Sequence, residues 1–79
     1  MKTAVFKKYE NGYYTFLFSN EEEIIFEEVD PRVLHKFDLK NDKSLINKTF
    51  TLNFVEVFDD DDEDFLIYRI EYLERMNSN

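Results

Sequence analysis

Two apolar runs near the end of the chain carry its clearest pattern. In Thr49–Phe58 apolar and polar side chains alternate, and in Phe65–Tyr72 strict alternation places Ile70 and Tyr72 on one face. A two-residue period is that of a strand with one buried face. The acidic run Asp59–Asp64 between them must stay solvated, so we predict a long β-hairpin with an acidic tip. The expected core-facing side chains of the first run are Phe50, Leu52 and Phe54.

The start of the chain predicts a second hairpin. Lys2–Tyr9 and Tyr13–Phe18 both read as strands, with Phe6 as the expected core residue of the first. Asn11 and Gly12 lie between them, and an Asn-Gly pair accommodates the two positive φ angles of a type I′ turn. Gly12 is the single glycine of the sequence, which strengthens this interpretation.

The middle of the chain predicts a third strand followed by a short helix. Glu21–Val29 opens with three glutamates, which are also good helix formers, but the β-branched pair Ile24 and Ile25 favours a strand. Asp30 is a suitable N-cap, and Pro31 suits the first helical position. We expect a helix of roughly two turns here.

These elements predict an all-β fold with one short helix. Their order resembles that of the OB-fold, a small five-stranded antiparallel Greek-key barrel, and an SH3-like barrel is an alternative. We expect one domain over residues 1–75 and a frayed tail over 76–79. A further alternative makes Phe65–Arg75 a helix, because acids before it and Arg75 near its end would match the helix dipole. That alternative gives an α+β fold.

Composition and charge limit the kinds of site and partner that the protein can have. A chain of 79 residues buries only about 60% of its unfolded surface, and nine Phe and five Tyr compensate for this. The absence of Cys excludes disulfides and thiolate sites. A net charge of −8 repels nucleic acid and anionic lipid and favours a basic partner. No run is long enough for a membrane helix or a signal peptide, so we expect a soluble, cytoplasmic protein.

The acidic run is the candidate cation site. Asp60, Asp62 and Asp64 have the spacing that opens an EF-hand loop, but no glycine follows and the closing glutamate is missing. Hard cations bind clustered carboxylates, so weak divalent-cation binding is an alternative. A solvated hairpin tip is the favoured interpretation, and we expect no cofactor.

Catalytic signatures are weak. His35 is the single histidine, and neither a second histidine nor a cysteine accompanies it. The serines lie in no nucleophile-elbow pattern, and one glycine cannot make a phosphate-binding loop. We therefore expect a protein that is not an enzyme.

The remaining hypothesis is an interaction or accessory module with two candidate surfaces. One is an aromatic sheet face formed by Tyr13, Leu17, Ile25 and Phe65. The other is the acidic tip, with Asp59, Asp60, Asp61 and Asp62 as candidate contacts to a basic protein. OB-type oligonucleotide binding is an alternative by fold analogy, but the acidic run stands where such a binder places Lys and Arg.

Overall fold

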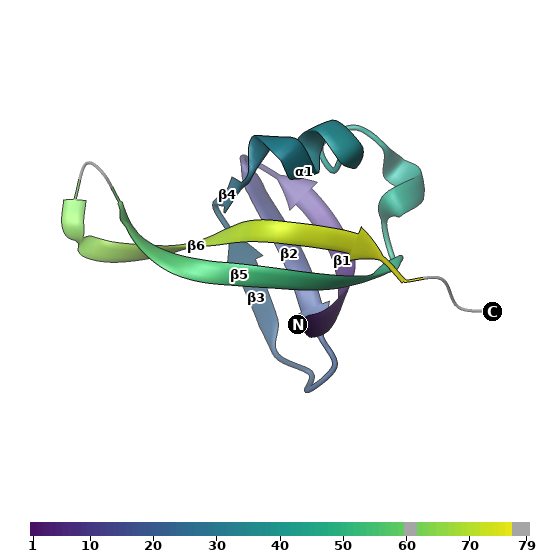
Figure 1. Ribbon diagram of the computed structural model, residues 1–79, viewed down its shortest axis with the longest axis horizontal. Coiled ribbons are helices and arrows are strands. Elements are labelled where there is room, and N and C mark those ends of the chain that lie inside the picture. The colour runs from purple at the N-terminus through teal and green to yellow at the C-terminus, as the bar shows by residue number, and fades with distance from the viewer. Residues whose placement is uncertain (60–61, 77–79) are drawn as a thin grey trace.

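Six strands pair into one mixed sheet, and a short helix packs against it (Figure 1). The computed structural model describes the backbone of residues 1–59 and 62–76, and the side chains of residues 1–58 and 65–76. The sheet order is β3-β2-β1-β5-β6-β4. The elements are β1 (Lys2–Glu10), β2 (Tyr13–Phe18), β3 (Glu23–Phe26), β4 (Glu28–Val29), α1 (Pro31–Lys36), the 3₁₀ helix η1 (Lys43–Leu45), β5 (Thr49–Asp59) and β6 (Asp62–Arg75).

The predicted first hairpin is confirmed. β1 and β2 pair antiparallel across a turn in which Asn11 has φ of 54° and Gly12 has φ of 88°. Positive φ at both central residues is what a type I′ turn requires, and Asn and Gly adopt it at least cost. The core-facing side chains of this hairpin include Ala4, Phe6, Tyr14, Phe16 and Phe18, all buried.

The predicted third strand is two strands on opposite edges of the sheet. β3 pairs antiparallel with β2, whereas β4 pairs parallel with β6. The direction changes at Glu27, whose backbone N–H donates to the Tyr68 carbonyl oxygen at 3.2 Å. Phe26 and Val29 are both buried although they are three residues apart, which a straight strand cannot achieve. The bend therefore lets both side chains reach the core.

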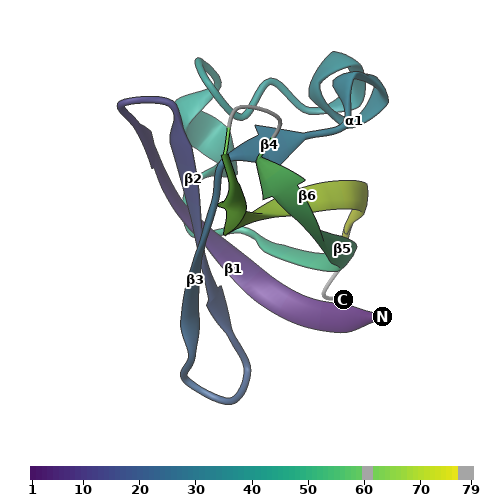
Figure 2. The same cartoon turned by 90° about the vertical axis from the view of Figure 1, so that its left-hand side faces the viewer.

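This bend brings the two sheet edges close without joining them. The chain crosses from one edge to the other within a few residues, so the sheet curls around the core (Figure 2). β3 and β6 nevertheless share no strand ladder, and β4 adds a parallel pairing. The five-stranded antiparallel barrel expected from the sequence is therefore not confirmed. The structure is a six-stranded mixed sheet that does not close.

The predicted C-terminal hairpin is confirmed, and the helical alternative for its second half is wrong. β5 and β6 pair antiparallel from Phe50–Arg75 to Asp59–Asp62. The predicted tip over residues 59–64 was too long, since Asp59 and residues 62–64 belong to the strands. Backbone pairing in a two-stranded ribbon does not require side chains to be buried, so a run of acids can extend a strand.

One bulge changes the predicted faces of β6. Phe54 pairs with Ile70, but its neighbour Asn53 pairs with Tyr72, which leaves Glu71 as an extra residue. Ile70 and Leu73 are consequently both buried, and Tyr72 is exposed. The sequence prediction that Ile70 and Tyr72 share a face is wrong for this reason.

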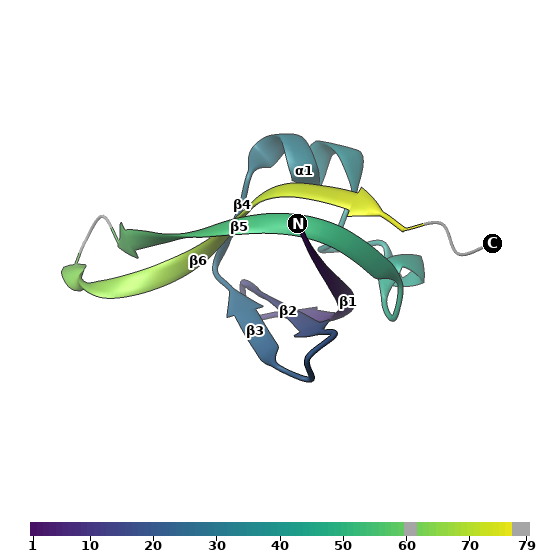
Figure 3. The ribbon, with the colours of Figure 1, turned by 60° about the horizontal axis from the view of Figure 1, so that its bottom comes forward.

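The predicted helix is confirmed and covers one side of the hairpin. The Asp30 side chain accepts a hydrogen bond from the Arg32 backbone N–H, as an N-cap does, and Pro31 begins the helix. Figure 3 shows α1 on one side of the β5–β6 hairpin and β1 to β3 on the other. Val33 anchors α1 to the core. Neither α1 nor any other described helix has the length and apolar character needed to cross a membrane.

Candidate interaction surfaces

The outer part of the β5–β6 hairpin extends beyond the rest of the sheet (Figures 1 and 3). β1 pairs with β5 only between Thr49 and Leu52, and β4 pairs with β6 only at Arg69 and Ile70. Residues 57–59 and 62–67 therefore pair only with each other within the described part of the chain. We call them the projecting hairpin.

Large apolar side chains are exposed on the projecting hairpin. Phe58 and Phe65 are each 63% exposed, and Leu66 is 51% exposed. Phe58 and Leu66 are direct cross-strand partners, so their side chains lie on the same face. Ile67, by contrast, is 7% exposed opposite Val57. The fold thus leaves three apolar side chains open at the end of the hairpin, the Phe58–Leu66 pair and the neighbouring Phe65, which together we call the hairpin patch.

The predicted aromatic sheet face is divided between two places. Tyr13 and Ile25 are exposed on the outer face of β2 and β3, with the half-buried Leu17 on the same face. Thr15 is buried between them and lies opposite Ile25. Phe65 lies elsewhere, on the projecting hairpin. Alternation along the strands predicted which side chains are exposed but not their arrangement in space, because that arrangement depends on how far the hairpin projects.

The acidic candidates lie mostly outside the described side chains. Asp60 and Asp61 are outside the described residues, and the side chains of Asp59, Asp62 and Asp64 are outside the described part as well. Contact with a basic partner and weak cation binding at these positions therefore stay predictions. Among the described residues, no group of three or more His, Cys, Asp or Glu side chains is placed to hold a metal ion.

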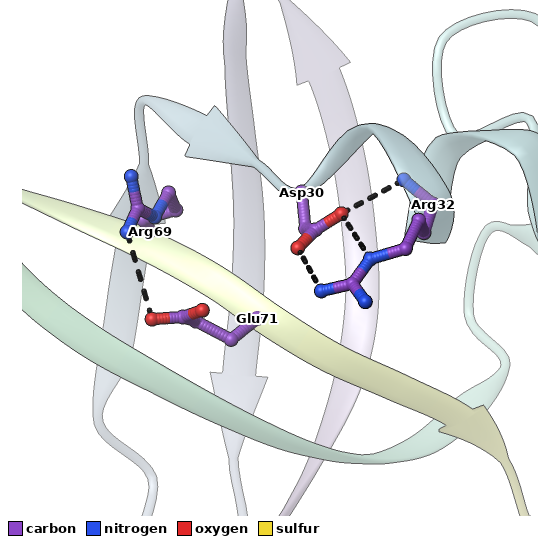
Figure 4. Close-up of polar contacts among 4 residues, drawn as sticks. All are labelled: Asp30, Arg32, Arg69 and Glu71. Atoms are coloured by element: carbon purple, nitrogen blue, oxygen red, sulfur yellow. Dashed lines mark hydrogen bonds and ion pairs between the residues drawn. The ribbon is translucent and has the colours of Figure 1, made fainter.

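Charged side chains gather where β4 meets α1 (Figure 4). Arg32 donates through Nε and Nη2 to the two carboxylate oxygens of Asp30, at 3.1 and 2.9 Å. These bonds and the backbone N–H of Arg32 lower the pKa of Asp30 to about 2. Arg69 lies 3.6 Å from carboxylate oxygens of both Glu28 and Glu71. The Arg69–Glu28 pair joins β6 to β4, and the Asp30–Arg32 pair lies within the helix start, so we assign these charges a structural role.

A pocket of about 520 Å³ marks the place where the sheet stays open. Aromatic side chains of Phe18, Phe54 and Tyr68 line it together with Ile24 of β3. Sequence reasoning missed this pocket because a closed barrel has no such gap. The three-residue spacing of Phe26 and Val29 was the available signal, since it does not fit a straight strand.

Neither a protein-family model, nor a curated protein, nor a solved structure matches this chain.

Proposed function

We propose that the protein is a non-enzymatic interaction module and that the hairpin patch is its contact surface. The observation that carries this proposal is the exposure of Phe58, Phe65 and Leu66 on a ribbon that extends past the sheet. Isolated exposed apolar residues are ordinary on protein surfaces. Several large exposed apolar side chains at the end of one projecting element are typical of a contact site.

The patch supplies part of a binding free energy. Fully burying a Phe or Leu side chain is worth about 1.5–3 kcal/mol, so the exposed fractions of these three side chains give roughly 3–5 kcal/mol in all. Association costs at least about 4 kcal/mol in lost translational and rotational freedom. The patch alone therefore gives a weak complex, and a stable one needs a further contribution.

Charge provides that contribution in this proposal. The acidic run 59–64 is adjacent in sequence to Phe58 and Phe65, and the whole chain carries a net charge of −8. A partner with Lys or Arg around an apolar groove would meet complementary charge, which raises the association rate and selects against acidic proteins. Such a complex should weaken as salt concentration rises.

Site-specific photo-crosslinking tests the proposal. Phe65 is replaced by a photoreactive phenylalanine analogue, and matched proteins carry the same analogue at Tyr13 or at His35, which is exposed on α1. In lysate of the source cells, we expect a discrete crosslinked product from position 65 that disappears when Phe58→Ser and Leu66→Ser are added. A product from position 13 alone would move the contact surface to the outer face of β2 and β3. Identical products from positions 65 and 35 would contradict the proposal.

A further inference from the structure

The outer edge of β3 has backbone groups free to pair. β3 lies at the end of the sheet and pairs only with β2 among the described strands. The Phe18 N–H donates to the Glu22 carbonyl oxygen at 2.8 Å, while Glu27 donates in the opposite direction, to β6. Backbone groups alternate in direction along a strand. The N–H and C=O groups of Glu23 and Ile25 therefore point away from β2.

A groove lies beside this edge. It is the pocket of about 520 Å³ between β3 and the base of the hairpin. Phe18 and Phe54 form its aromatic floor with ring centroids 5.8 Å apart, and Tyr68 lies 5.6 Å from Phe54. Its rim carries charges of both signs, with the exposed carboxylates Glu22 and Glu56 and the exposed residues Met1 and Lys2. The groove thus combines an apolar floor with a charged rim, and the negative charge is concentrated along β3, where Glu22, Glu23 and Glu27 are all exposed.

We propose that this groove binds an extended peptide segment, which pairs with β3 as an added strand and carries alternating apolar and basic residues. An added strand places alternate side chains on opposite faces. Those on the core side would rest on Ile24 and the aromatic floor. Those on the outer face would lie beside Ile25 and the exposed carboxylates Glu23 and Glu27, where Lys or Arg fits the charge.

The groove is a different site from the hairpin patch, on which the proposed function rests. None of the hairpin-patch residues lines the groove, so either surface can be tested without the other. β3 is four residues long, and a paired segment of that length extends about 13 Å. The ligand is therefore a short linear segment rather than a folded surface.

A second copy of the chain fits this edge poorly. Antiparallel pairing of two β3 edges centred on Ile25 would place Glu23 opposite Glu27 of the second copy, and Glu22 opposite Glu28. Like charges directly opposite each other destabilise a strand pair, and charged edges are a common means of preventing self-association. The same carboxylates attract a basic segment.

Fluorescence anisotropy with synthetic peptides tests this proposal. The probe is a labelled octapeptide of alternating Val and Lys. One control is an octapeptide of alternating Val and Glu. The other controls are two Val and Lys octapeptides, one N-methylated at the odd-numbered amides and one at the even-numbered amides. The protein variants are Ile25→Pro, which removes the outward N–H, and Ile25→Thr, which keeps that N–H and the branched Cβ. We expect saturable binding of the Val and Lys peptide by wild type and Ile25→Thr. Ile25→Pro should bind roughly three- to tenfold more weakly, as expected for one lost hydrogen bond.

Charge at the rim is tested by Glu56→Lys, which changes an exposed side chain. We expect weaker binding of the Val and Lys peptide by this variant. If wild type binds the N-methylated peptides as tightly as the unmethylated Val and Lys peptide, strand addition is overturned. This comparison uses only wild type, so it holds even if far-UV circular dichroism shows that Ile25→Pro is unfolded. Three other results would also overturn the proposal: the Val and Lys peptide does not bind, the protein prefers the Val and Glu peptide, or the protein dimerises in sedimentation equilibrium.

Discussion

Replacing Phe26 by Leu should destabilise the fold at the point where the sheet curls. Phe26 is fully buried, and it directly precedes the bend at Glu27. Its ring lies 5.2 Å from that of Phe54 and 5.7 Å from that of Phe16, both at steep angles. It also contacts Tyr68, with ring centroids 6.2 Å apart. Phe26 therefore joins β2, β3, β5 and β6 through one side chain.

The expected loss follows from these contacts. Leu retains most of the apolar burial but loses the edge-to-face ring contacts, each worth about 0.5–1.5 kcal/mol. Because the rings share one site, the contributions do not add, and we expect a loss of about 1–2 kcal/mol in the free energy of unfolding. A chain of this length has about 4–12 kcal/mol in total. Phe26→Ala, at about 3–5 kcal/mol, should remove a much larger share of that total than Phe26→Leu.

Urea unfolding followed by far-UV circular dichroism measures this loss. The matched control is Phe65→Leu, because Phe65 is 63% exposed on the projecting hairpin and should change stability by less than about 0.5 kcal/mol. A loss of 1 kcal/mol lowers Tm by roughly 4–8 °C in a domain of this size. Phe26→Leu should therefore lower Tm by at least about 4 °C, and the control should leave Tm nearly unchanged. Equal losses for the two variants would refute the assigned burial of these side chains.

Three further predictions concern the helix cap, the first turn and the hairpin patch. The folded-state pKa of Asp30 is about 2, below the value near 3.9 of an unfolded chain. Its stabilising effect is therefore complete above pH ~4 and is lost as pH falls from ~4 to ~2, and acid titration of unfolding should show this dependence reduced in Asp30→Asn. Gly12→Ala should cost about 1–2 kcal/mol in thermal unfolding, because φ is 88° although nothing lies within 4 Å of an added Cβ; an unchanged Tm would contradict the turn geometry. Phe58→Ser with Leu66→Ser should leave urea stability within about 0.5 kcal/mol of wild type, and a larger loss would show that the fold uses these side chains.

Local signals in the sequence were sufficient for most elements. The Asn11-Gly12 turn depends on the backbone preferences of two residues, and the start of α1 depends on the cap at Asp30 and on Pro31. Alternation over Phe50 to Phe54 was enough to assign β5 and its buried face. These features are encoded within a few residues of where they occur, so a single sequence shows them.

The features that the sequence did not reveal depend on distant parts of the chain. Bulges at Lys7 and Glu71 shift the alternation, and the first brings Tyr9 to the core beside Tyr14, with ring centroids 4.9 Å apart. The parallel pairing of β4 with β6 requires the bend at Glu27. Nothing in the local pattern marks these positions, because each is fixed by what packs against it.

The candidate surfaces, too, could be predicted only where they depend on local sequence. Exposure of Phe65 was predicted from composition and alternation, but exposure of Phe58 and Leu66 was not recognised. Their exposure arises because β1 and β4 pair only with the inner part of the hairpin. How far neighbouring strands extend is a tertiary property, and it decides which apolar residues of a hairpin remain uncovered.

The most direct test of the proposed function is the affinity of the crosslinked partner for two forms of the protein. Isothermal titration would compare wild type with the Phe58→Ser, Leu66→Ser variant, after urea unfolding has shown that their stabilities agree. Loss of about two thirds of the patch's apolar contribution predicts at least a tenfold rise in Kd, and the wild-type Kd should rise with salt concentration. An equal Kd for the two forms would show that the partner binds elsewhere and that the hairpin patch is not the contact surface.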